Sequence, residues 1–187
     1  PHCGKNIVKW LTVLTGAALR TYVVKTKYPD VLVLEYGIDR PGDMDILLRI
    51  AEPFIGVVTA IGEIPVHLEF FKNAEELARE KQKLVGDIGK DGYAILNADD
   101  SRVYRMAEKT YAQVITYGFG EKADVRAGNY AVRLVKNDQE TDVPEGITFK
   151  VGYAGSVVPI RLHGVLGKPQ AYAAEAAVAV GAALGVN

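Results

Sequence analysis

The stretch YAILNADDSRVYRMAEKTYAQVITY, residues 93–117, decides the fold class. It begins with an apolar run at 93–96, passes through a helical pattern at 101–109 and ends with a second apolar run at 113–117. Continuous apolar runs of this length are typical of parallel strands that are covered on both faces, with a helix as the crossover between them. The stretch therefore predicts a strand, a helix and a second, parallel strand.

The same alternation occupies the chain before residue 93. Apolar residues at three- and four-residue spacing indicate helices, and short apolar runs next to turn residues indicate strands. The expected helices cover 6–22, 43–51 and 73–89, and the expected strands cover 31–34 and 55–59. Such alternation predicts an α/β fold with a doubly wound, mostly parallel sheet flanked by helices.

The pattern changes after about residue 120. Three runs of alternating apolar and polar residues, separated by turn residues, predict a small antiparallel β annex joined by hairpins. These runs are 130–135, 148–153 and 157–162, and an alanine-rich helix is expected at 169–184. We expect one domain over 1–187, with a parallel α/β part at 1–120, the annex at 121–165 and a closing helix at 166–187.

The composition excludes several classes of protein. The 23 Asp and Glu residues balance the 22 Lys and Arg residues, so the chain has no global basic field for nucleic acid. Cys3 is the only cysteine, which excludes an intrachain disulfide and favours a cytoplasmic location. No stretch reaches the roughly 18 unbroken apolar residues of a membrane-spanning helix. The chain begins without Met, and we expect it to be a piece of a longer protein.

Polar side chains follow three of the expected strands. Glu35 follows the run at 31–34, Thr59 closes the next strand, and Asn97 and Asp99 follow the strand at 93–96. Ligands bind beyond the carboxyl ends of the strands in an open parallel sheet, so these residues are candidates for a site. Each of them alone is more simply explained as a loop residue or a helix cap. Their convergence on one edge favours a site.

Five motifs in a fixed order carry a resemblance to a known family. They are Val33-Leu34-Glu35-Tyr36-Gly37, Val57-Val58-Thr59, His67-Leu68-Glu69, Lys81 fourteen positions after His67, and Asn97-Ala98-Asp99-Asp100. From about residue 6 onward the chain resembles the central domain of the Mur ligases. Within that family it is most similar to the type that adds D-alanyl-D-alanine to the UDP-muramoyl tripeptide.

The resemblance implies a magnesium site. Glu35 matches an acidic residue that holds magnesium beside the nucleotide phosphates, and His67 matches a histidine that ligates a second magnesium. Lys81 matches a lysine that is carbamylated by carbon dioxide and helps to bridge the two metal ions, which makes it the candidate catalytic residue. The alternatives are an exposed carboxylate, a structural histidine and a solvated lysine.

The resemblance also implies an ATP site. Asn97 and Asp99 match a motif that faces the nucleotide, although an Asx turn or an N-cap would use the same side chains. Gln170 takes the place of an asparagine that helps to hold the base, and Pro169 takes the place of a histidine. The implied cofactors are ATP and magnesium.

No Gly-x-x-x-x-Gly-Lys-Ser/Thr phosphate loop occurs in this sequence. In the family that loop lies upstream of the segment that begins near Asn6, and a C-terminal domain would follow Asn187. We therefore expect the central domain of an ATP-dependent amide ligase of peptidoglycan precursor synthesis, inactive by itself, whose intact form binds a nucleotide and a UDP-muramoyl-peptide-like substrate. The alternatives are a non-catalytic Mur-like binding module and a ligase of the folylpolyglutamate or poly-glutamate synthetase type.

Overall fold

The structure is a computed structural model that describes residues 6–23, 29–62 and 70–186. The chain divides into two compact units, residues 1–35 and residues 36–187. The first unit contains helix α1 (Ile7–Tyr22), as expected. The Asn6 side chain caps this helix by accepting hydrogen bonds from the amides of Val8 and Lys9 at 3.1 and 3.2 Å.

The strand expected at 31–34 is absent. These residues have no regular secondary structure, and Val33 is 89% exposed. A strand is stabilised by pairing its backbone groups with a neighbouring strand. Among the described residues none pairs with this run, so its apolar composition alone does not make it a strand.

The second unit is built on one six-stranded sheet with the strands in sequence order. The strands are β1 (Ile55–Val58), β2 (Tyr93–Asn97), β3 (Gln113–Gly118), β4 (Val125–Lys136), β5 (Asp142–Tyr153) and β6 (Ser156–His163). β1 to β4 pair in parallel, whereas β4, β5 and β6 pair antiparallel. The expected α/β class and the antiparallel annex are confirmed, and the strands of the annex are longer than the sequence runs that predicted them.

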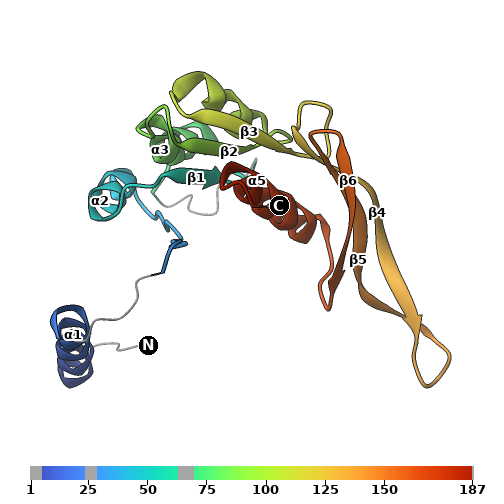
Figure 1. Cartoon of the computed structure of the whole chain (residues 1–187), viewed down its shortest axis with the longest axis horizontal. Helices are drawn as coiled ribbons and strands as arrows, with labels where there is room; N and C mark the ends of the chain where they lie inside the picture. Colours follow the sequence, from blue (N-terminus) through green and yellow to red (C-terminus); the bar gives the residue numbers. More distant parts are fainter. Residues whose placement is uncertain (1–5, 24–28, 63–69, 187) are drawn as a thin grey trace. The chain divides into compact units, whose positions relative to one another are not determined.

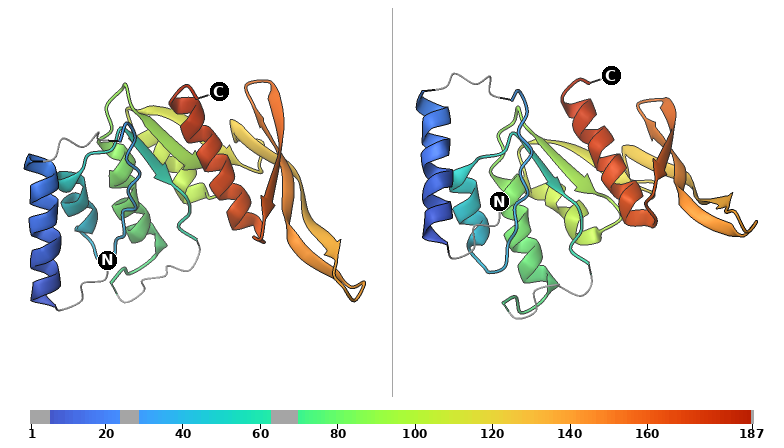
Figure 2. Two further views of the ribbon diagram at one scale, coloured as in Figure 1. Left: turned by 60° about the horizontal axis from the view of Figure 1, so that its bottom comes forward. Right: turned by 90° about the horizontal axis from the view of Figure 1, so that it is seen from below.

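Helices cover both faces of this sheet (Figures 1 and 2). One face carries α2 (Asp43–Ile50), α3 (Ala74–Gly86), α4 (Ser101–Tyr104) and the 3₁₀ helix η1 (Arg105–Lys109). The other face carries α5 (Lys168–Ala183). No helix in the described part of the chain is long and apolar enough to cross a bilayer.

Alternation along β2 divides the core into two layers. Ala94 and Leu96 pack with the α2 and α3 side, whereas Ile95 packs with the α5 side, and all three are fully buried. This is the pattern of a strand covered on both faces, which the apolar run at 93–96 predicted. The buried sheet leaves its carboxyl edge as the place where loops with polar residues gather.

Candidate active site

The loops after β1, β2 and β3 meet at one edge of the sheet. The register pairs Val58 with Leu96 and Leu96 with Thr116, so the three strands end side by side. The amide of Ala98 donates to the carbonyl oxygen of Tyr117 at 2.8 Å, which joins the loop after β2 to the end of β3. Residues 59–62, 97–100 and 118–120 therefore form the candidate site.

Asp100 ties two of these loops together. Its Oδ1 accepts from the amides of Arg102 and Val103, at 3.0 and 3.3 Å, and so caps α4. Its Oδ2 accepts from the amides of Ile61 and Gly62, at 2.8 and 3.2 Å. Burial raises the pKa of this carboxyl group, but the four amides outweigh burial and the pKa falls below 3.8. Asp100 therefore places a fixed negative charge at the edge.

Lys81 reaches this edge from α3. Its Nζ donates to the carbonyl oxygen of Ala60 at 3.0 Å, two residues beyond β1. Burial lowers the pKa of the ammonium group, and the negative charge of Asp100 opposes that effect. A lowered pKa increases the fraction of neutral amine, which is the form that reacts with carbon dioxide.

Asn97 and Asp99 organise the loop after β2. Asn97 is buried, and its Oδ1 accepts from the amide of Asp99 at 2.9 Å, as in the Asx turn that was one of the two interpretations of this motif. The other interpretation, nucleotide contact, stays a prediction. The N-cap of α4 is Asp100, which follows both residues.

Asp99 holds the loop after β3. Its Oδ2 accepts from the amide of Phe119 at 2.7 Å, and its Oδ1 accepts from the amide of Gly120 at 2.9 Å. The glycines on either side of Phe119 make room for this carboxylate, because a Cβ atom on Gly118 or Gly120 would come within 2.9 or 2.7 Å of it. Any larger side chain at these positions would displace Asp99.

Helix α5 begins beside the same loop. The ammonium group of Lys168 lies 5.0 Å from the ring centroid of Phe119, and the ring of Tyr172 packs edge-on against Phe119 at 5.2 Å. Gln170 is exposed in the first turn of this helix, after Pro169. The start of α5, including Gln170, therefore lies next to the Asp99 loop.

The remaining predicted site residues are not part of this geometry. Glu35 is an exposed residue of the first unit, whereas the residues of the candidate site belong to the second unit. His67 lies outside the described residues. Within the described ranges, no group of three or more His, Cys, Asp or Glu side chains is arranged to hold a metal ion. The second unit thus brings Lys81, Asn97, Asp99 and Gln170 to one edge.

Sequence reasoning assigned no role to Asp100, Tyr172 or Glu175. Asp100 stands inside a motif that was recognised, and its position before Ser101 is a helix-cap signal. Tyr172 donates its hydroxyl to Asp99, 73 positions earlier in the chain, and no local pattern predicts such a contact. The spacing of Tyr172 and Glu175 on one helix face was the only available signal.

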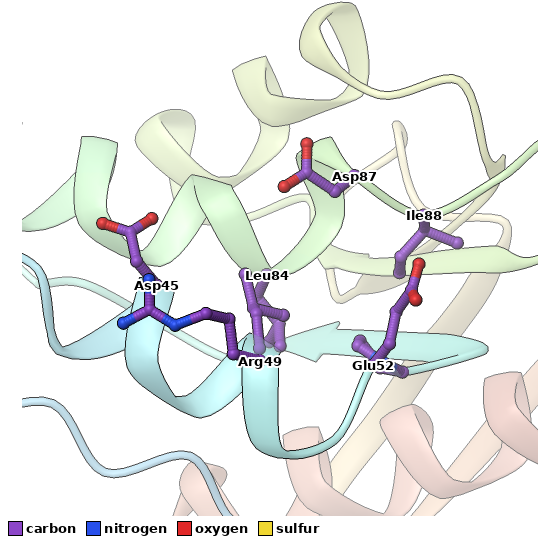
Figure 3. Close-up of a pocket in the computed structure, with 8 residues that line it drawn as sticks. Asp45, Arg49, Glu52, Leu84, Asp87 and Ile88 are labelled. Carbon is purple, nitrogen blue, oxygen red and sulfur yellow. The ribbon is translucent and has the colours of Figure 1, made fainter.

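A cavity of about 400 Å³ lies at the opposite, amino-terminal edge of the sheet (Figure 3). Asp45 and Arg49 of α2, Glu52 after it, and Leu84, Asp87 and Ile88 at the end of α3 line this cavity. Lys81, Asn97, Asp99 and Gln170 are not among its lining residues, so the cavity is separate from the candidate site.

Comparisons with known proteins point to one family. The family model described as the Mur ligase middle domain matches residues 14–181. A UDP-N-acetylmuramoyl-tripeptide–D-alanyl-D-alanine ligase of Mycobacterium leprae is 41% identical over 100 residues, which are 54% of this chain and 19% of that protein.

Solved structures show the same fold. A crystal structure of MurF from Acinetobacter baumannii matches with a TM-score of 0.66 at 25% identity, over 81% of this chain and 30% of that chain. MurF ligase from Thermotoga maritima, in complex with ADP, matches with a TM-score of 0.70 at 23% identity, over 87% of this chain and 35% of that chain. The chain thus spans between about a fifth and about a third of the length of these proteins.

Proposed function

This chain belongs to the Mur ligase family, and we propose that it is the central, nucleotide-binding part of an ATP-dependent ligase of peptidoglycan precursor synthesis. The relative from Mycobacterium leprae is named for the addition of D-alanyl-D-alanine, which makes that reaction the first candidate. One observation carries the proposal: Lys81 Nζ lies 3.0 Å from the carbonyl oxygen of Ala60 at the carboxyl edge, beside Asp100.

The proposed reaction has two steps. ATP phosphorylates a carboxylate of a UDP-muramoyl-peptide-like substrate, which forms an acyl phosphate and releases ADP. The amine of the second substrate then attacks the acyl carbon, and the tetrahedral intermediate expels phosphate and loses a proton to leave an amide. Cationic groups are needed to stabilise charge on the transferring phosphoryl group in the first step and on the leaving phosphate in the second. The proposed location of the enzyme is the cytoplasm.

The role proposed for Lys81 depends on carbamylation. Magnesium prefers hard oxygen ligands, so an ammonium group cannot serve, whereas a carbamate on Nζ supplies two oxygen atoms. The half-buried position of Lys81 fits that chemistry because burial lowers the pKa of the ammonium group, and this effect outweighs the opposing charge of Asp100. Glu35 and His67 are the other proposed ligands. When bound, magnesium would neutralise phosphate charge.

The nucleotide is proposed to lie beside the start of α5. Gln170 is exposed there and carries an amide that can pair with a base edge. Both carboxylate oxygens of Asp99 accept hydrogen bonds from the protein, so its proposed role is to position the Phe119 loop and α5. Asn97 is proposed to hold the same loop in shape through its Asx turn. The complex of the Thermotoga maritima neighbour with ADP supports a nucleotide as the ligand.

A non-catalytic Mur-like binding module is the second candidate. Pro169 and Gln170 replace the residues expected there, which favours this candidate. The placement of Lys81 favours the ligase. A ligase of the folylpolyglutamate or poly-glutamate synthetase type would use the same edge with a different carboxylate and amine.

Phosphate release tests the proposal. The assay supplies ATP, magnesium, UDP-muramoyl tripeptide and D-alanyl-D-alanine to this chain and to any longer protein that its gene is found to encode. We expect negligible release by the chain and ligation by the longer protein, with activity lost in Lys81→Ala and retained in Lys83→Ala, a matched lysine on the same helix. Release that persists in Lys81→Ala would contradict the role of this lysine. A longer protein that binds ATP and ligates neither dipeptide nor glutamate would establish the binding module instead.

A further inference from the structure

Helix α5 carries an acidic residue at the centre of the face that packs on the sheet. Ala171, Glu175 and Ala179 recur four positions apart, and each is 0% exposed. Alanines at this spacing allow the helix to lie close to β2, β3 and β4, which it contacts. Figure 1 shows α5 lying across this part of the sheet. Glu175 thus occupies a position at which the pattern of the face calls for a small apolar residue.

The Glu175 carboxyl group is buried and poorly satisfied. Within the described residues neither Oε1 nor Oε2 forms a hydrogen bond of good geometry, and the backbone amide of Gly118 is the donor that favours its charged form. The groups that face it are the carboxylate of Asp99 in the loop after β2, the hydroxyls of Tyr117 on β3 and Tyr172 on α5, and the backbone amide of Gly118. In the described part of the chain no lysine or arginine forms an ion pair with it.

This arrangement favours an uncharged Glu175. A buried carboxylate with no cation and no strong donor is costly, so the group keeps its proton. Burial, and to a smaller extent the negative charge of Asp99, raise the pKa of Glu175 to about 8, and the Gly118 amide opposes them. Asp99, in contrast, accepts hydrogen bonds from two backbone amides and from the Tyr172 hydroxyl.

We propose that Glu175 is a protonation switch: as a neutral acid it allows α5 to pack on the sheet, and as a carboxylate facing Asp99 it releases the start of the helix. A carboxylate on the buried Glu175 side chain is repelled by the carboxylate of Asp99, which is exposed at the edge of the sheet, and hydration of Glu175 requires that α5 move away from β3. The segment that moves includes Tyr172, whose hydrogen bond to Asp99 connects α5 to the site loop. A rise in pH that ionises Glu175 therefore loosens the loop at 118–120 through the loss of the bond between Tyr172 and Asp99.

The sign of the pH dependence follows from the pKa of Glu175 in the two states. The folded state binds the proton up to about pH 8, whereas the unfolded chain loses it near pH 4.5. The stabilising contribution is therefore fully present below about pH 4.5 and is lost as the pH rises toward about 8. One proton gives a limiting slope of about tenfold per pH unit in the unfolding equilibrium constant.

The first experiment titrates the side chain in the full chain by NMR, with ¹³C-labelled glutamate carboxyl groups. Glu175→Gln assigns the resonance, and Glu121→Gln serves as the control, because Glu121 is exposed. We expect a midpoint near pH 8 for the resonance that Glu175→Gln removes. A Glu175 midpoint near 4.5 would overturn the proposal.

The second experiment measures the release of the helix. Amide hydrogen exchange, expressed as protection factors, is followed in the first half of α5 between pH 6 and pH 9. We expect protection to fall about tenfold per pH unit up to the midpoint in the wild-type chain and to stay constant in Glu175→Gln and in Glu175→Met, which places an unbranched apolar side chain there. Equal loss of protection in the wild type and both variants would overturn the switch.

A third measurement separates the switch from the proposed function. Any effect of the switch on nucleotide binding rests on that proposed function. If the chain binds ADP, affinity should fall above the midpoint in the wild type and not in Glu175→Gln. An elevated midpoint together with ADP affinity that does not change with pH would remove the link to nucleotide and overturn that part of the inference alone. Failure of the chain to bind ADP at any pH would count against the proposed function, because the carboxyl titration and hydrogen exchange need no ligand.

Discussion

The hydroxyl of Tyr172 donates to Oδ2 of Asp99 at 2.8 Å, although the two residues are 73 positions apart. This bond joins α5 to the loop after β2, and Asp99 in turn holds the amides of Phe119 and Gly120. Three segments of the candidate site therefore depend on one carboxylate. Its removal should disturb the site through geometry rather than through the loss of a ligand contact.

Tyr172→Phe should weaken the attachment of α5. The ring and its contact with Phe119 remain, whereas the hydrogen bond to a charged acceptor is lost. We expect the free energy of unfolding to fall by about 1 to 2 kcal/mol, because Asp99 keeps its two amide donors. Urea unfolding measures the change. Tyr111→Phe is the control, since Tyr111 is 79% exposed, and an equal loss in this control would contradict the assignment.

Asp100→Asn should destabilise the chain in a pH-dependent manner. The amide can still cap α4 through its oxygen, but its NH₂ group cannot accept from Ile61 and Gly62. We expect a loss of about 1 to 3 kcal/mol at neutral pH. Because the folded pKa of Asp100 is lowered, its contribution is present above pH 3.8 and is lost as the pH falls through the folded value.

The difference between wild type and Asp100→Asn should accordingly shrink in acid. Unfolding curves recorded at neutral pH and at successively lower pH values measure this convergence. Asp138→Asn, in the exposed turn between β4 and β5, should follow the wild type throughout. Curves for Asp100→Asn that stay equally far from the wild type at every pH would show that the ionised carboxylate is not the stabilising species.

Glu80→Ala should loosen the start of α2. Glu80 is buried, and its Oε1 accepts from the amides of Gly42 and Met44 at 2.9 and 3.0 Å, which caps α2 from a neighbouring helix. Removal leaves two amides without their acceptor, and we expect a loss of about 2 kcal/mol. Lys83→Met removes the ion pairs with Glu80, at 2.9 Å, and with Asp45, at 2.7 Å, but leaves both amides with their acceptor, so it should cost less than Glu80→Ala. Chemical denaturation ranks the two variants, and the reverse order would be inconsistent with a capping role.

Lys81 should form a carbamate at lower pH than Lys83. Burial lowers its pKa, whereas Asp45 and Glu80 raise the pKa of Lys83 on the same helix. Carbon NMR with ¹³C-bicarbonate should reveal a carbamate signal that Lys81→Arg abolishes and Lys83→Arg leaves unchanged. Arginine keeps the positive charge and does not form the adduct under these conditions. A signal that survives in Lys81→Arg would assign the carbamate to another amine.

Part of the fold could be predicted because its signals are local. The strands within 93–117 are encoded by apolar runs and are present, and the helix expected at 101–109 is present as the short helix α4 followed by the 3₁₀ helix η1. The runs at 31–34 and 55–58 look alike in sequence, yet only the second is a strand. Ile55 pairs with Tyr93, and Val58 pairs with Leu96, whereas the first run has no partner among the described residues. Strand pairing is a property of distant segments, so composition alone could not distinguish the two runs.

In the candidate site, too, only the features with a signal in the sequence could be predicted. Lys81 was singled out by its spacing from His67, and the structure places its ammonium group at the expected edge of the sheet. The contacts of Asp99 could not be predicted, because its partners come from the loop after β3 and from α5. The buried position of Glu175 also depends on which face of α5 meets the sheet, and an alanine-rich helix is nearly uniform in that respect.

The parallel and antiparallel halves of the sheet are joined by only two residue pairs, Tyr117 with Val125 and Gly118 with Arg126. The strands β4, β5 and β6 follow one another through hairpins, so during synthesis this meander can assemble from neighbours as soon as it leaves the ribosome. Helix α5 contacts β2, β3 and β4 and so bridges the junction. The two halves should therefore become a single cooperative unit only after residues 168–183 have been synthesised and have docked.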